Sequence, residues 1–213
     1  MAEADATAHL QPGSTPPPAK GVCAMEATLA NGMARVEAGQ WLVGKGQPVA
    51  FAGARCRSET LRGFLAPDRA RLSQLTASAA LYCASAERPF LTRLDCPLPL
   101  WVVSEKVLVA PASARTGAAL QRLIPMSLRL ALCVTTFRGA WVVTATRSRT
   151  TRVVLAEGET LTVRREAVVA WTTRAPTGFV PKLRLRDLLL PNARPKAMMV
   201  SFYGPGTLWM EGA

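Results

Sequence analysis

Three segments of the chain share one pattern, and this internal repeat restricts the fold more than any other feature. They begin at Glu37, Cys96 and Glu157 and read EAGQWLVGKGQPVAF, CPLPLWVVSEKVLVA and EGETLTVRREAVVAW. The second and third align at an offset of 61 residues, and the first and third at 120. Each has a polar turn, a short alternating strand, a second turn, and a strand of small and β-branched residues. Alternation with period two is typical of half-buried strands, so each segment predicts a β-hairpin.

A second element also recurs, with two strands flanking a turn that contains glycine. It covers Leu132–Thr144 and Met198–Met210, and a copy without glycine covers Gln74–Ala84. Glycine suits such turns because it adopts backbone angles that other residues avoid. The expected structural turn residues are Gly139, Gly158, Gly204, Pro205 and Gly206.

These two elements predict an all-β fold: a tandem β-sandwich or short double-stranded β-helix built from about three diverged hairpin repeats. One or two short connecting helices are expected, because some segments break the strand pattern. The candidate helices are Ser58–Leu72, Gly117–Ile124 and the ambiguous Lys182–Leu190.

The domain organisation follows from composition. Residues 1–20 are rich in small polar residues and proline, with Pro16-Pro17-Pro18 near the end, which predicts a flexible tail. Residues 21–213 form one predicted β-rich domain. Its expected repeats cover about 22–80, 81–140 and 141–213. No apolar stretch approaches the roughly 18 residues of a membrane span, and early acidic residues argue against a secretory signal or a mitochondrial transit peptide.

The C-terminal phrases resemble those of a known family. Gly204-Pro205-Gly206 with Trp209, and Gly158-Glu159 with Leu161 and Val163, are similar to motifs of the altered inheritance of mitochondria family (member twenty-four). That family is placed with the tryptophan RNA-binding attenuator protein-like folds. The resemblance spans about residues 22–213 and implies tandem β architecture and frequent oligomerisation, with no established catalytic residues. The attenuator protein's binding of tryptophan and RNA does not transfer with the fold.

The residues offer little catalytic chemistry. The single histidine, His9, lies in the predicted tail, and the five cysteines are scattered without a CxxC pair, which is typical of free thiols in a reducing, cytoplasmic setting. A phosphate-loop spacing at Gly39–Gly46 lacks the Ser or Thr that binds magnesium and fits a turn better. Glu157 and Glu159 fit solvated turn carboxylates better than an acid–base pair. No catalytic, metal or cofactor site is predicted.

Charge supplies the one candidate binding set. The net charge is +12, and residues 129–194 contain 12 basic and 4 acidic side chains. Basic excess favours nucleic acid or anionic surfaces, although solvated arginines on the outer faces of strands are the better explanation. The candidate anion contacts are Arg147, Arg149, Arg152, Arg164 and Arg165. In a regular strand Arg147 and Arg149 would share one face and Arg152 would lie on the other.

Two functions remain open. The first is a non-enzymatic structural or interaction protein that self-associates, or binds a protein partner, through sheet edges or apolar faces. The alternative is a nucleic-acid or anionic-surface binding module that uses the basic C-terminal half. The low aromatic content of 6% weakens the single-stranded nucleic-acid version of that alternative.

Overall fold

Short strands form along the whole described part of the chain. A computed structural model describes residues 27–30, 32–44, 49–51, 56–60, 72–122, 131–173, 176–179 and 199–212. The strands are β1 (Ala27–Ala30), β2 (Met33–Val36), β3 (Gly39–Gly44), β4 (Val49–Phe51), β5 (Cys56–Thr60), β6 (Leu72–Ala77), β7 (Leu81–Ala84), β8 (Phe90–Asp95), β9 (Leu100–Val103), β10 (Val107–Pro111), β11 (Arg115–Arg122), β12 (Ala131–Phe137), β13 (Trp141–Thr146), β14 (Thr150–Leu155), β15 (Thr160–Arg164), β16 (Val168–Trp171), β17 (Thr177–Phe179), β18 (Met199–Tyr203) and β19 (Gly206–Glu211). Single-turn 3-10 helices, named η2 (Ser104–Lys106), η3 (Ala112–Ala114) and η5 (Arg165–Ala167), connect some of them. The predicted all-β fold class is confirmed.

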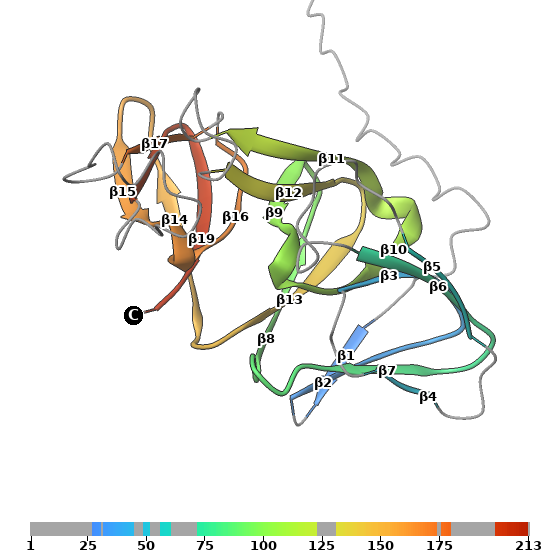
Figure 1. Cartoon of the computed structure of the whole chain (residues 1–213). Coiled ribbons are helices and arrows are strands. Elements are labelled where there is room, and N and C mark those ends of the chain that lie inside the picture. Colours follow the sequence, from blue (N-terminus) through green and yellow to red (C-terminus); the bar gives the residue numbers. More distant parts are fainter. Residues whose placement is uncertain are drawn as a thin grey trace, which may run out of the picture.

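The strands form four antiparallel sheets, which we name A to D. Sheet A has the order β1-β2-β7-β4, and sheet B has the order β5-β6-β3-β10-β13-β8. Sheet C has the order β11-β12-β9-β16-β19-β14, and sheet D has the order β15-β18-β17. Figure 1 shows the sheets following one another from sheet A at the bottom to sheet D at the upper left.

The topology repeats every six strands. Adding six to each strand number of sheet B gives the order of sheet C. The repeating units are therefore β2–β7 (residues 33–84), β8–β13 (residues 90–146) and β14–β19 (residues 150–211). Each unit gives three strands to one sheet and three to the next, so sheets B and C are each shared by two units.

The predicted hairpins are wrong in their pairing, although their strands exist. β3 and β4 lie in different sheets, and so do β9 and β10, and β15 and β16. β3 pairs instead with β6 and β10, and β9 pairs with β12 and β16. The second repeated element behaves in the same way, because β12 and β18 each cross to a neighbouring sheet through the glycine-containing turn. Crossing between sheets buries both faces of strands such as β10, whose residues are buried throughout.

Three apolar cores fill the spaces between successive sheets. The core between sheets A and B holds Trp41 against Trp141, with ring centroids 5.7 Å apart. The core between sheets B and C is centred on Phe137. The core between sheets C and D holds Trp171 against Phe202, with centroids 5.4 Å apart. The middle sheets are therefore covered on both faces.

One helix prediction falls on a strand, and so do the two described ends of another. Gly117–Arg122 belongs to β11, which pairs with β12 from Arg115 opposite Phe137 to Arg122 opposite Ala131. Ser58–Thr60 belongs to β5, and Leu72 begins β6. The available partner strand overrides local helix propensity in both places. Residues 61–71, 182–190 and the predicted tail lie outside the described residues.

Within the described part of the chain, no helix is long and apolar enough to span a membrane.

Candidate functional site

The candidate arginines lie around one end of the third unit. Arg147 and Arg149 belong to the turn between β13 and β14, Arg152 lies on β14, and Arg164 and Arg165 lie where β15 passes into η5. The strand expected to run through Arg147 and Arg149 is absent there, because this turn carries the chain from sheet B to sheet C. Four of these side chains are exposed and Arg165 is half-buried.

Arg152 is held against an aromatic ring. It lies opposite Trp209 in the β14–β19 pair, and its guanidinium carbon is 6.0 Å from the ring centroid. Arg93 is placed similarly in the second unit, 5.4 Å from the centroid of Trp141. Arg93 also forms an ion pair with Asp95 at 3.2 Å. Such cation–π contacts at exposed sites add modest stability and keep the planar cation available to solvent.

A buried ion pair joins the second and third units beside these arginines. Lys106, in η2, is 3% exposed, and its Nζ donates to Glu211 Oε1 at 2.9 Å. The same Nζ donates to the carbonyl of Glu166 in η5 at 2.5 Å. The other carboxylate oxygen of Glu211 accepts the Arg147 backbone N–H at 3.0 Å. Glu211 therefore fixes the turn that carries Arg147 to the strand that ends the third unit.

Little in the sequence indicates this ion pair. Lys106 aligns with Gln47 in the first copy and Ala167 in the third, so a charge at a position that is uncharged in the other copies is the only signal. Burial lowers the pKa of Lys106 from its usual 10.5, and the hydrogen bond and charge of Glu211 oppose that shift. Because both acceptors lie in the adjoining unit, the lysine serves chiefly to hold the units together.

The thiols of Cys96 and Cys133 are poor nucleophiles. Burial, and then the charge of Asp95, raise the pKa of Cys96 to about 12. Burial also raises the pKa of Cys133, although Arg165 opposes the shift. The thiolate is the reactive form, so neither group suits nucleophilic catalysis at neutral pH. Among the described residues, no cluster of three or more metal-ligating side chains occurs.

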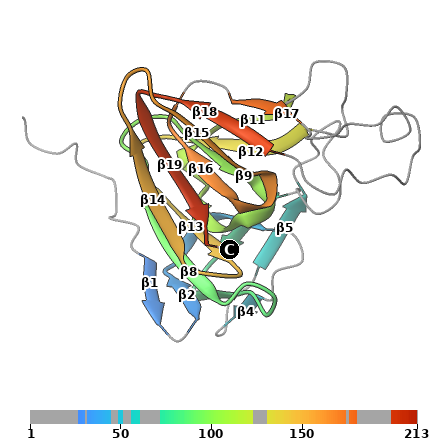
Figure 2. The ribbon, with the colours of Figure 1, turned by 90° about the vertical axis from the view of Figure 1, so that its left-hand side faces the viewer.

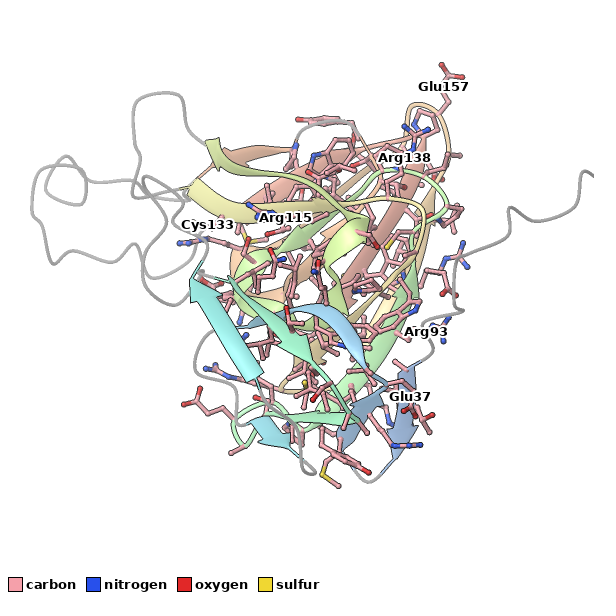
Figure 3. The ribbon with its side chains drawn as sticks, turned by 90° about the vertical axis from the view of Figure 1, so that its right-hand side faces the viewer. Glu37, Arg93, Arg115, Cys133, Arg138 and Glu157 are labelled. Carbon is pink, nitrogen blue, oxygen red and sulfur yellow. The ribbon has the colours of Figure 1, made fainter. Side chains whose placement is uncertain are left out.

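Glu157 and Glu159 lie in a turn between strands, and most of the phosphate-loop spacing lies in a strand, so neither forms a catalytic or phosphate-binding loop. Glu159 accepts the Ala156 backbone N–H at 2.7 Å across the turn between β14 and β15. Figure 3 shows Glu157 pointing away from the tip of the molecule, at the end opposite Glu37. The first six residues of the phosphate-loop spacing, Gly39–Gly44, form β3, where Trp41 is fully buried.

The glycine turns are sterically required at the last crossing. A Cβ on Gly204 would lie 1.9 Å from the Ala156 carbonyl oxygen. Gly206 has a φ of 152°, and a Cβ there would lie 2.8 Å from Thr173 Cγ2. Gly139 and Gly158 also have positive φ, at 78° and 81°, and Pro205 follows Gly204 through a cis peptide bond. These residues shape the connections between sheets.

The feature with most bearing on function is the joint that fuses two units into one sheet. In sheet B, β3 of the first unit pairs with β10 of the second, with Val43 opposite Val109. In sheet C, β9 of the second unit pairs with β16 of the third, with Val102 opposite Ala170. Both joints are buried in the middle of the molecule.

Each end of the molecule holds one unmatched half of that joint. β15 is the third member of the series β3, β9, β15, and β4 is the first member of the series β4, β10, β16. Within the described residues, β15 pairs only with β18 and β4 pairs only with β7. Sheet D therefore ends at β15 and sheet A ends at β4.

Comparison with known proteins supports the fold and leaves the activity open. No family model matches the chain, and no curated protein matches it significantly. One similar solved structure is the crystal structure of protein SPYM3_0169 from Streptococcus pyogenes, a structural genomics target. It has a TM-score of 0.62 and 14% identity, and the match covers 89% of this chain and 93% of that one. At this identity the likeness concerns the fold alone. The resemblance to the altered inheritance of mitochondria family stays a prediction.

Proposed function

We propose that this protein is a non-enzymatic interaction protein that assembles with further copies of itself. One observation carries the proposal: the joint that fuses neighbouring units occurs twice inside the chain, and its two halves are left over at β15 and β4. Unpaired strand edges are templates for pairing with another chain.

The chemistry of the described residues supports a role without catalysis. The raised pKa values of Cys96 and Cys133 disfavour thiolate chemistry. Lys106 has a lowered pKa, but its ammonium donates to the Glu211 carboxylate and to the Glu166 carbonyl. The single histidine, His9, lies outside the described residues. A cytoplasmic location belongs to the same proposal, and the free thiols of Cys96 and Cys133 support it.

Size-exclusion chromatography with light scattering tests self-association. The purified chain should show a mass above 22.8 kDa that rises with protein concentration. A constant monomer mass across the accessible concentration range would contradict the proposal. The same measurement in reducing buffer excludes association through disulfides.

A second candidate is binding of nucleic acid or an anionic surface through the basic C-terminal half, which the exposed arginines of the third unit support. Arg147 and Arg149 share one turn, and Arg152 lies nearby on β14 with its guanidinium over Trp209. Replacing these three arginines by glutamine should weaken binding to RNA, DNA or anionic vesicles and reduce its dependence on salt. Binding that is absent, or that does not change between low and high salt, would exclude this function. Arg35→Gln is a matched control, since Arg35 is exposed but forms an ion pair with Glu37 at 2.8 Å in the first unit.

A further inference from the structure

We propose that β15 of one molecule pairs antiparallel with β4 of a second copy, in the register of the two internal joints. This inference rests on the proposed self-association and names the surfaces and the register that produce it. The occupant of each free edge is the opposite end of an identical chain. The contact is therefore head-to-tail, and it leads to a ring or to an open chain of copies.

The register follows from the internal joints. Val102 lies opposite Ala170, and Trp101 lies opposite Trp171. Val163 follows Val102 by 61 residues, and Ala50 precedes Ala170 by 120 residues. Carrying these offsets over places Val163 opposite Ala50 and Thr162 opposite Phe51 in the second copy. The other internal joint agrees, because Val43 precedes Val163 by 120 residues and pairs with Val109 in the equivalent position.

One chain cannot close this joint on itself in the arrangement described. Figures 1 and 2 both place β4 and β15 at opposite ends of the molecule. The two edges lie far apart. Among the described residues, pairing of one edge therefore leaves the other edge unpaired.

The outer face of β15 sets the strength of the contact. Thr160, Thr162 and Arg164 are exposed. In β9, the residues that align with Thr162 and Arg164 are Trp101, half-buried, and Val103, which is buried. Polar and charged side chains on an edge strand weaken its pairing with other chains. We therefore expect a reversible contact that is weaker than the internal joints.

Cysteine cross-linking tests the register directly. Residues opposite each other in antiparallel strands have Cα atoms about 4.5–5.5 Å apart, which is within the span of a disulfide. Thr162→Cys and Phe51→Cys are prepared as separate proteins, mixed, and oxidised mildly. The mixture should form a cross-linked dimer in roughly tenfold greater yield than a mixture of Thr151→Cys with Phe51→Cys. Thr151 is an exposed residue on the edge strand β14 and is the matched control. Arg164→Cys with Val49→Cys gives a second pair in the same register.

A second variant keeps the proposal falsifiable if a cysteine disturbs the fold. Thr162→Trp with Arg164→Val gives β15 the residues found at the aligned positions of β9. This double variant should associate more tightly, with Kd lower by roughly tenfold. Thr150→Trp with Arg152→Val makes the same two substitutions at the same spacing on β14, the edge strand of sheet C, and should leave Kd unchanged.

The outcomes separate the two proposals. If the wild-type chain stays monomeric, both the proposed function and this inference fail. If it associates, but cross-linking does not exceed the β14 control and the β15 variant leaves Kd unchanged, only this inference is overturned. Cross-linking in the predicted register together with tighter association of the β15 variant supports both.

Discussion

The middle sheets and the terminal sheets are made from aligned strands, yet they meet different surroundings. β13 in sheet B, with the sequence WVVTAT, is buried at every position, and β16 in sheet C, with VVAW, is buried likewise. β15 in sheet D reads TLTVR and is buried only at Val163, and β2 in sheet A alternates between exposed and buried residues. Sheets covered on both faces need continuous apolar strands, whereas end sheets keep the alternating pattern.

This difference fits the outer face of the end sheet to contact with water. In stacked repeats, the end units need polar outer faces to remain in water. Thr162 and Arg164 meet that need at the positions where Trp101 and Val103 extend the core. Among the described residues, however, the outer backbone edges of β4 and β15 have no partner strand. The end sheet thus has a polar outer face but a backbone edge that can still pair.

The largest expected effect sharpens the contrast between a middle and an end sheet. Leu208, in sheet C, is fully buried. It belongs, with Trp171, to the core between sheets C and D. Leu208→Ala should lower the free energy of unfolding by about 3 kcal/mol, because the cavity stays lined by packed side chains. Leu161→Ala, in the end sheet, removes the same atoms from a half-buried site and should cost about 1 kcal/mol. Urea denaturation of both variants measures the difference, and equal losses would show that the end sheet is as tightly packed as the middle one.

A smaller effect is expected at the ion pair between the units. Lys106→Met should lower the free energy of unfolding by about 2 kcal/mol, since Glu211, which keeps some exposure to solvent, loses its buried partner. The double variant Lys106→Met with Glu211→Leu should recover part of that loss, because no unpaired charge remains. A double-mutant cycle completed with Glu211→Leu checks this, and additive effects would mean that the pair does not couple the units.

The smallest effect is a dependence on pH. Burial holds the pKa of Lys106 below its usual 10.5, so the unfolded chain binds a proton that the folded chain releases between the two values. The stability of the wild type relative to Lys106→Met should therefore rise as the pH increases through the folded-state pKa towards 10.5. Thermal melts of the two proteins from pH 7 to pH 10.5 measure this difference. A difference that falls over that range would contradict the lowered pKa.

The sequence predicted the strands better than their partners. Alternation and the offset of 61 residues identified β9, β10, β15 and β16, and glycine marked the turns at Gly139 and Gly204. Pairing was predicted within each segment, because a short turn between two strands usually closes a hairpin. The candidate arginines were located only as a charged stretch, and the role of Lys106 was missed, because its partner Glu211 lies 105 residues away.

The sequence by itself determined an all-β chain with a recurring pattern of strands and turns, because residue periodicity and glycine act locally. Tertiary structure alone decided that β3 joins β10 and that β9 joins β16, since a strand's partner depends on which edge is available in space. Tertiary structure also decided which strands of each copy lie in a middle sheet and which lie in an end sheet. The same alternating strand lies in a covered sheet at β9 and at an open edge at β15, because only β9 has a further unit beside it.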